Sequence, residues 1–60
     1  MSAVTDEPIL VKRYARARLY DTFHRRYVTV ALLRDWQRCG ISFVVLDTET
    51  GDDVTRVLLA

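Results

Sequence analysis

The side chains best suited to chemistry are the basic groups between residues 12 and 26. This segment holds six basic residues and one acidic residue, Asp21. The basic residues are Lys12, Arg13, Arg16, Arg18, Arg25 and Arg26. Clustered Lys and Arg side chains neutralise phosphates and release counterions. The cluster therefore predicts contact with nucleic acid, and the alternative left open is a solvated hairpin face that pairs locally with Asp21.

Three tyrosines lie within and beside this basic segment, at Tyr14, Tyr20 and Tyr27. Tyrosine rings can stack on bases, as they do in proteins that bind single strands. Such rings more often form half-buried pairs across neighbouring strands, and we favour that structural interpretation.

Enzyme and metal chemistry lack the necessary groups. The chain has one His and one Cys, whereas a zinc site needs at least three protein ligands. Asp52 and Asp53 are expected on an open turn without a desolvated cleft, and Ser42 lacks flanking elbow glycines. We expect no enzyme, no metal and no cofactor. We interpret His24 as an exposed loop residue and Cys39 as a small buried hydrophobe.

The charge is segregated along a short chain. The 60 residues have a net charge of +1 and are 50% hydrophobic, which suits one small globular domain of marginal stability. Residues 47–60 carry four acids and one base. Such a molecule could bind nucleic acid at its basic end or associate head to tail with a second copy. With no signal peptide and no apolar span, we expect a soluble cytoplasmic protein.

Local patterns predict the elements that position these residues. Residues 9–14, 18–22 and 27–29 are candidate strands, with residues 23–26 as a hairpin linker. Thr29 is a suitable N-cap for a helix over about residues 30–39, which Gly40 would end.

The remaining elements follow the helix. Residues 42–47 are a candidate strand, and because residues 43–46 are apolar on both faces we expect it to be central and covered on both sides. A turn at 48–51, with Gly51 left-handed, would lead to brief pairing by Asp53 and Val54.

An internal repeat extends this interpretation. Asp21-Thr22 and Val28-Thr29 recur 26 residues later as Asp47-Thr48 and Val54-Thr55. By analogy Thr55 would cap a second helix starting at Arg56. So short a helix would need a partner or a longer chain to be stable.

The predicted fold is a small α+β domain over residues 9–60, after a flexible lead-in at 1–8. It comprises a β-meander, one central helix, a second β-hairpin and the start of a C-terminal helix. Five residues are expected in its core or in a dimer seam: Leu32, Leu33, Trp36, Phe43 and Val45.

The sequence also resembles a known family, the N-terminal domain of the polyhydroxyalkanoate (polyhydroxybutyrate) accumulation regulators. The resemblance rests on Arg18-Leu19-Tyr20-Asp21-Thr22 followed by Thr50-Gly51-Asp52-Asp53-Val54-Thr55. It implies a DNA-binding domain of a bacterial transcriptional regulator, a repressor of genes for polymer synthesis and granule-associated proteins. The residues that fall on the family's motif by position are Lys12, Arg13, Tyr14, Arg18, Leu19, Tyr20, Asp21, Thr22, Tyr27 and Thr29. The predicted DNA contacts are the six basic residues and Tyr20.

The resemblance also implies partners and shows departures. We expect double-stranded DNA and a homodimer, with granule contact confined to a region outside these residues. The family usually has Pro-Asn-Arg where this chain has Ala15-Arg16-Ala17, which affects sequence specificity more than fold. The alternative function is a dimerisation or protein-docking module without DNA contact.

Overall fold

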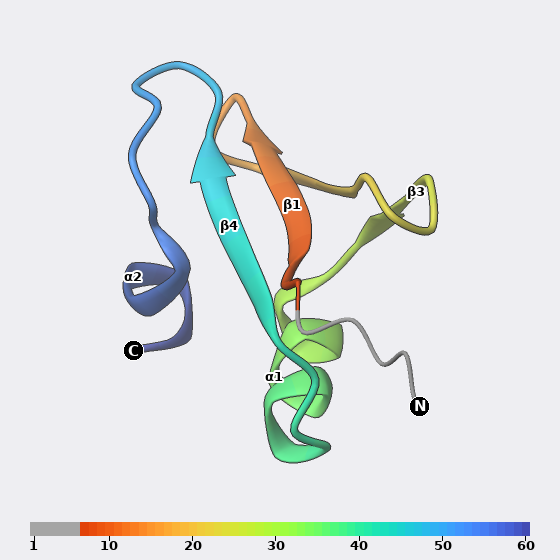
Figure 1. Ribbon diagram of the computed structural model, residues 1–60. Helices are drawn as coiled ribbons and strands as arrows, with labels where there is room; N and C mark the ends of the chain where they lie inside the picture. Colours follow the sequence, from red (N-terminus) through yellow and green to blue (C-terminus); the bar gives the residue numbers. More distant parts are fainter. Residues whose placement is uncertain (1–6) are drawn as a thin grey trace.

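The computed structural model describes residues 7–60, and the predicted lead-in falls mostly outside them. The elements, in chain order, are β1 (Ile9–Tyr14), β2 (Arg18–Asp21), β3 (Arg26–Val28), α1 (Val30–Arg38), β4 (Phe43–Asp47) and α2 (Thr55–Leu59). The strands form one sheet in the order β3-β2-β1-β4 (Figure 1). The α+β class is thus confirmed.

The first three strands are the predicted meander, because β1 pairs antiparallel with β2, and β2 with β3. The fourth strand lies on the other side of β1 and runs parallel to it. Parallel strands need a long crossover connection, which here is made by α1. β1 is therefore an inner strand that joins the antiparallel meander to the parallel strand β4.

The prediction that residues 42–47 form a central, doubly covered strand was wrong. β4 lies at the edge of the sheet, and Val44 and Leu46 are half-buried on the face opposite Val45. The chain beyond β4 protects its outer edge: the Val54 N–H donates to the Val45 carbonyl, and the Asp47 N–H to that of Asp52. The predicted return pairing is present as a single bridge between Leu46 and Asp53.

The predicted first helix is confirmed at both ends. The Thr29 hydroxyl accepts a hydrogen bond from the Leu32 N–H at 3.2 Å, as an N-cap does. At the other end Gly40 has a φ of 78°, and the Ile41 N–H donates to the Trp36 carbonyl at 2.9 Å. Cys39 was expected to be buried but is exposed; it is the C-cap residue that follows the last turn of α1.

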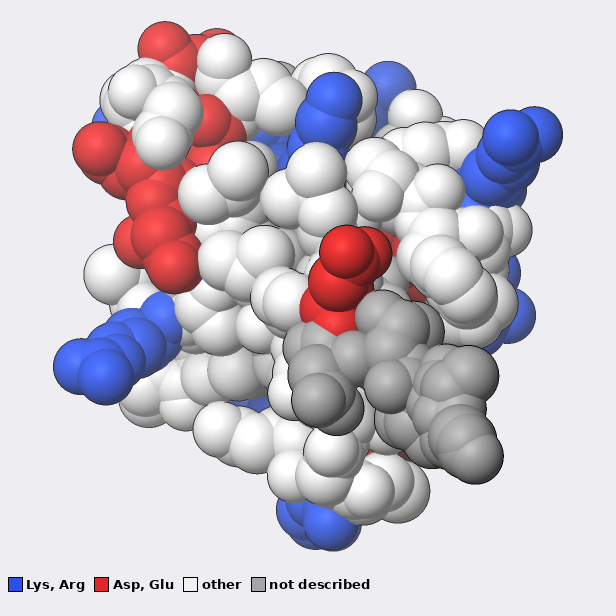
Figure 2. Space-filling model, viewed as in Figure 1, with Lys and Arg blue, Asp and Glu red and all other residues white. Residues whose placement is uncertain are grey.

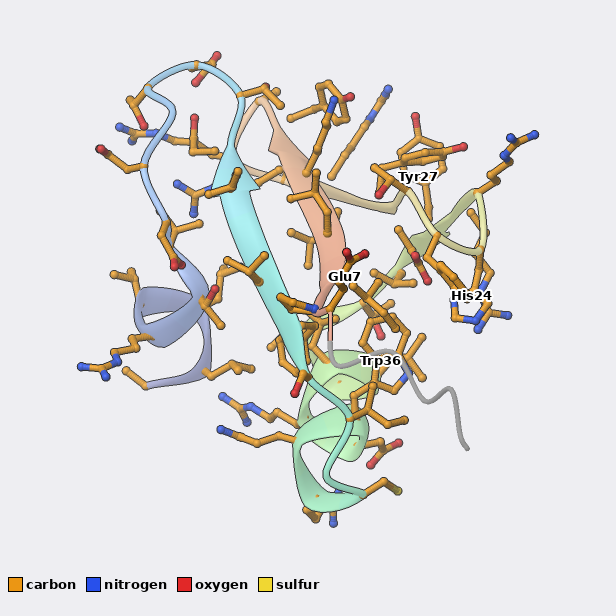
Figure 3. The ribbon with its side chains drawn as sticks, viewed as in Figure 1. Glu7, His24, Tyr27 and Trp36 are labelled. Atoms are coloured by element: carbon orange, nitrogen blue, oxygen red, sulfur yellow. The ribbon has the colours of Figure 1, made fainter. Side chains whose placement is uncertain are left out.

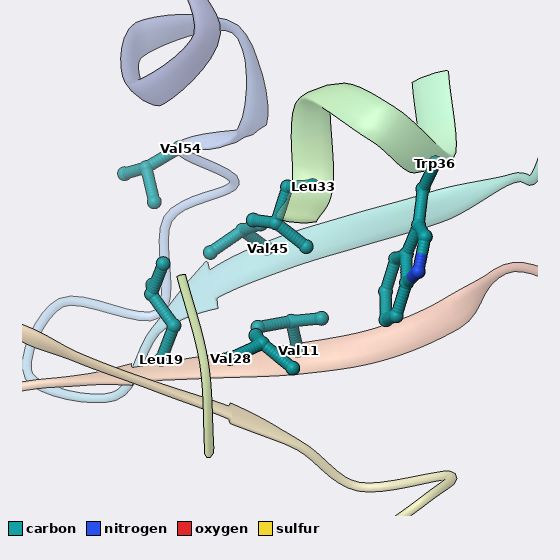
Figure 4. Packing of buried hydrophobic residues seen from close by; sticks show 7 residues of the cluster. All are labelled: Val11, Leu19, Val28, Leu33, Trp36, Val45 and Val54. Atoms are coloured by element: carbon teal, nitrogen blue, oxygen red, sulfur yellow. The ribbon is translucent and has the colours of Figure 1, made fainter. Parts of the chain in front are cut away.

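The core lies between one face of the sheet and the two helices (Figure 4). α1 contributes Leu33 and Trp36, and the strands and the segment before α2 contribute the rest. The buried hydrophobic residues are Val11, Leu19, Val28, Leu33, Trp36, Val45 and Val54. Leu32 and Phe43 are partly buried and pack against this cluster. Burying one such side chain contributes about 1.5–3 kcal/mol, so few can be lost.

Candidate nucleic-acid interface

Asp21 organises the turn between β2 and β3. Its side chain is fully buried, and Oδ1 accepts hydrogen bonds from the Phe23 and His24 N–H groups at 2.8 and 3.0 Å. The second oxygen, Oδ2, lies 2.5 Å from Nδ1 of His24. The next residue, Thr22, donates from both its N–H and its hydroxyl to the Leu10 carbonyl. The turn is thereby fixed to β1.

Asp47 repeats this arrangement after β4. Its Oδ1 accepts from the Glu49 and Thr50 N–H groups at 2.8 and 3.2 Å, and Oδ2 binds the Arg13 guanidinium at 2.6 Å. Thr48 donates from its N–H and its hydroxyl to the Arg13 carbonyl. The structure therefore confirms the internal repeat as two equivalent Asp-Thr turns.

The repeat continues into the fifth residue of each turn and into the strand pairing. Arg25 and Gly51 each donate an N–H to the carbonyl of their aspartate at 2.7 Å, and both have positive φ, at 59° and 78°. We call residues 19–29 the first unit and residues 45–55 the second unit. The pairing of Tyr20 with Tyr27 in the first unit corresponds to the bridge of Leu46 with Asp53 in the second unit.

Thr55 departs from the repeat, and its predicted capping role was wrong. Thr55 is the first residue of α2, and the N-cap residue Val54 has no side-chain cap bond. The Thr55 hydroxyl instead accepts from the Val45 N–H at 2.8 Å and donates to Asp53 Oδ1 at 2.6 Å. The Thr55 hydroxyl therefore pairs with the Val45 N–H on the outer edge of β4 and does not cap α2.

The strand register relates the two units by an approximate two-fold rotation about an axis through Lys12, normal to the sheet. Tyr20 and Leu46, which correspond in the repeat, both pair with Lys12 from opposite sides. The rotation exchanges the pair Leu19–Arg13 with the pair Val45–Val11. It likewise exchanges Asp21–Val11 with Asp47–Arg13. Both aspartates consequently lie on the helix-bearing face, at opposite ends of the sheet.

The two turns share a backbone but differ in charge. The first carries Arg25 and Arg26 after its aspartate, whereas the second carries Glu49, Asp52 and Asp53. In Figure 2 the acidic side chains gather over the loop that follows β4, and basic side chains project over the β2–β3 hairpin. A polyanion would therefore meet the first unit favourably and the second unfavourably.

The pKa values of both buried aspartates lie below the usual value for a carboxyl group, so both side chains stay ionised at lower pH than a free aspartate. Burial raises the pKa of Asp21, but the N–H groups of His24 and Phe23 and the His24 ring lower it more. The Arg13 guanidinium and the Glu49 N–H lower the pKa of Asp47, against a smaller opposing effect of burial. Hydrogen bonds to the charged form thus outweigh desolvation at both sites.

The face of the sheet opposite the helices is basic and aromatic on the side of the first unit. Strand register places Lys12, Tyr14, Arg18, Tyr20 and Tyr27 there. Leu10, Val44 and Leu46 occupy the same face toward β4. No strand residue of this open face is acidic, and Asp53 joins it only beyond the β4 edge.

A hollow of about 340 Å³ opens on this face, lined by Tyr14, Arg18, Tyr20 and Tyr27. The rings of Tyr20 and Tyr27 meet edge to face, with centroids 5.2 Å apart. Figure 3 shows Tyr27 on the β2–β3 hairpin, away from the core residue Trp36. The favoured structural interpretation of the tyrosines accounts for this pair, although Tyr27 remains 63% exposed.

The seven predicted DNA contacts do not share one surface. Lys12, Arg18 and Tyr20 lie on the open face, while Arg13 and Arg26 occupy positions on the helix-bearing face. Arg13 is held by Asp47 and its side chain is only 16% exposed.

Arg16 and Arg25 sit in the two turns of the meander. These turns lie at opposite ends of β2, about 10 Å apart for a strand of four residues.

Sequence reasoning missed the roles of Asp21 and Asp47 as buried organisers of turns. The signal was available in the repeat itself, because Asp-Thr recurs directly after each of two β-prone runs. An aspartate that accepts from the N–H groups two and three residues later is a common turn device. Its partner Arg13, 34 residues away, could not be found without the fold.

The described part of the chain contains no group of three or more residues suited to hold a metal ion. Among residues 7–60, no helix is long and apolar enough to cross a membrane.

The fold and its open face define a small α+β binding domain whose basic and acidic turns are segregated. The comparison with known families makes this class specific. The family described as the PHB/PHA accumulation regulator DNA-binding domain matches residues 10–60. The chain belongs to this family of DNA-binding domains.

Two curated relatives have similar sequences. An uncharacterized protein of Allochromatium vinosum is 44% identical over 50 residues, which are 83% of this chain and 33% of the relative. An uncharacterized protein in the phbA 5′ region of Thiocystis violacea is 42% identical over 50 residues, which are 83% of this chain and 36% of the relative. The chain thus spans about a third of the length of these relatives. No solved structure matches it.

Proposed function

We propose that this domain serves a bacterial repressor of polyhydroxyalkanoate genes and binds duplex DNA through the open face of β1 and β2. One observation carries the proposal: Lys12 and Arg18 lie together on the helix-free face. Arg16 lies in the adjoining turn between β1 and β2 and extends this basic surface. Among the described residues none of these three forms an ion pair, so their charges are available to phosphates.

The family assignment and one relative support the regulatory part of this proposal. The family is described as the DNA-binding domain of accumulation regulators. The relative from Thiocystis violacea is named for its position in the phbA 5′ region. A regulator of such genes would work in the cytoplasm and would contact DNA as a two-fold dimer, which is the common arrangement for domains of this size.

The exposed side of α1 is a weaker candidate for DNA contact. Arg38 is paired with Asp35 at 2.5 Å, and both side chains are largely exposed. A phosphate approaching Arg38 would meet the carboxylate as well, which lowers the gain from neutralisation. Arg34 and Arg38 therefore provide a control pair of equal charge on another surface.

The test is the salt dependence of binding to a duplex. If Lys12, Arg16 and Arg18 each reach a phosphate, log affinity should fall against log salt with a slope of about −2.7. Replacing Arg16 and Arg18 by Ala should flatten the slope by about 2, for specific and random duplex alike, because phosphate contacts position without specifying. Fluorescence anisotropy with a labelled duplex measures both quantities.

The Arg34/Arg38 double Ala variant removes the same charge from α1 and should leave the slope nearly unchanged. A larger loss from this pair than from Arg16 and Arg18 would move the DNA surface to the helix. Equal losses would mean that the variants report only total charge.

The charge segregation between the two turns favours a second candidate, a docking module whose basic turn meets an acidic partner (Figure 2). Light scattering separates the two. A doubled mass without any DNA binding supports docking, whereas DNA binding supports the first proposal whether or not the mass doubles.

A further inference from the structure

We infer that the hollow formed by Tyr14, Arg18, Tyr20 and Tyr27 takes an unpaired nucleobase, so that the domain binds single-stranded DNA in addition to duplex. The inference extends the proposed function and shares Arg18 with it. It rests on separate features, namely exposed ring faces, a hollow of limited size and a guanidinium beside it.

The first feature is the exposure of aromatic surface where the sheet is not covered. Tyr27 is 63% exposed and Tyr14 is 39% exposed, both on the helix-free face. The Tyr20–Tyr27 pair is edge to face, with an interplanar angle of 74°, which leaves ring faces unstacked. Bases stack on such faces regardless of sequence, because every base has a π-face.

The second feature is the chemistry around the rings. Among residues 7–60 no carboxylate lines the hollow, and none forms a hydrogen bond with the three phenol groups or the Arg18 guanidinium. Lys12 lies next to Tyr20 in the cross-strand register. A base on the rings would therefore place its phosphate near Arg18 or Lys12, the combination found in proteins that bind single strands.

The third feature is size. A hollow of about 340 Å³ lies at the small end of the range for ligand pockets, which fits a single nucleotide. In a duplex the ring faces of the bases are covered by their neighbours, and only edges and phosphates are accessible. Stacking in this hollow therefore requires an unpaired strand, whereas the phosphate contacts proposed above do not.

The test uses a short labelled oligothymidine, which does not pair with itself, and fluorescence anisotropy. We expect binding by the parent chain and a loss of about 5- to 150-fold in affinity for Tyr27→Ala, the range of one lost base stack. Tyr27→Phe keeps the ring and should bind like the parent. Phe23→Ala removes a ring that is 70% exposed but outside the hollow, and should also bind like the parent.

A second probe needs no variant and so does not depend on folding. An oligonucleotide of the same length made of abasic sites keeps the phosphates but lacks bases, and the parent should bind it at least about 5-fold more weakly. Equal binding of the two probes would overturn the inference, as would equal losses for Tyr27→Phe and Tyr27→Ala.

Failure here is distinguishable from failure of duplex binding. Tyr27→Ala should retain the duplex salt slope, because Tyr27 carries no charge. Duplex binding without oligothymidine binding would refute the single-strand site alone, and oligothymidine binding without duplex binding would refute the proposed function alone.

Discussion

Two aspartates fix the two turns of this domain, although aspartate side chains are usually exposed on protein surfaces. Asp21 and Asp47 are buried. Each carboxylate accepts hydrogen bonds from two backbone N–H groups and contacts one further side chain, that of His24 or Arg13 respectively. A buried carboxylate without such partners would cost several kcal/mol. Here the hydrogen bonds keep both groups charged and fix the turns that carry the charged side chains.

These two aspartates predict how stability depends on pH. Their folded-state pKa values lie below those of an unfolded chain, so their contribution is fully present above about pH 4. It is lost as the pH falls through the lowered values. The urea midpoint should therefore decrease progressively below about pH 4, when followed by Trp36 fluorescence.

Asp47→Asn should lower stability at neutral pH and make the acid decrease shallower, because one titrating group is gone. Asp35→Asn is the control, since its pair with Arg38 is exposed on both sides and contributes little. An acid decrease as steep in Asp47→Asn as in the parent would contradict the role given to Asp47.

At the scale of elements, the turn between β1 and β2 carries strain that the sequence did not reveal. Ala15 and Arg16 have φ values of 50° and 60°, although neither is glycine. The Ala17 N–H closes the turn on the Tyr14 carbonyl at 3.0 Å. A proline at position 15 could not adopt this backbone, because its ring holds φ near −65°. The turn here therefore differs from one built on Pro-Asn-Arg.

Ala15→Gly should stabilise the domain by about 1 kcal/mol, since glycine adopts positive φ without the steric penalty of a Cβ. The matched control is Ala17→Gly, whose φ is not positive and which should slightly lower stability through unfolded-state entropy. Urea denaturation measures both. Equal effects of the two substitutions would show that Ala15 is not strained.

At the scale of the whole molecule, the two units have the same backbone arrangement on opposite sides of β1. They share the aspartate, the threonine bonded to β1, the left-handed fifth residue and the buried valine. They differ in their helices, because α1 has nine residues and α2 has five. They also differ in the charge of their turns, so the approximate symmetry of the backbone is not a symmetry of binding.

This equivalence predicts that the first turn can be transplanted. Replacing Glu49, Thr50, Gly51 and Asp52 by Phe, His, Arg and Arg should leave the fold intact, because Asp47 accepts from the backbone N–H groups two and three residues later, as Asp21 does. The cost should be about 1 kcal/mol, from placing arginine at the positive φ of Gly51. Circular dichroism and urea denaturation measure it.

The transplanted turn should also steepen the duplex salt slope, since a repelling turn becomes an attracting one. A Gly51→Arg single variant isolates the backbone cost. Loss of cooperative unfolding in the transplant, with the single variant still folded, would show that the two turns are not interchangeable.

The sequence by itself determined the elements and their local chemistry. The spacing of Leu33 and Trp36, the Thr29 cap and Gly40 defined α1, because helix periodicity and capping are local properties. The recurrence of Asp-Thr and Val-Thr revealed the repeat, because it is visible in the order of the residues without any knowledge of the fold.

The tertiary structure alone decided which strands are neighbours and which side chains are free. Nothing local shows that β4 would pair parallel to β1 at an edge, since that register depends on the crossover through α1. The same pairing brings Asp47 to Arg13 and removes that arginine from the accessible basic residues. The pairing of β1 with β2, and of β2 with β3, places Lys12, Arg18 and the tyrosines on one open face, because the register decides which of the alternating side chains of neighbouring strands share a face.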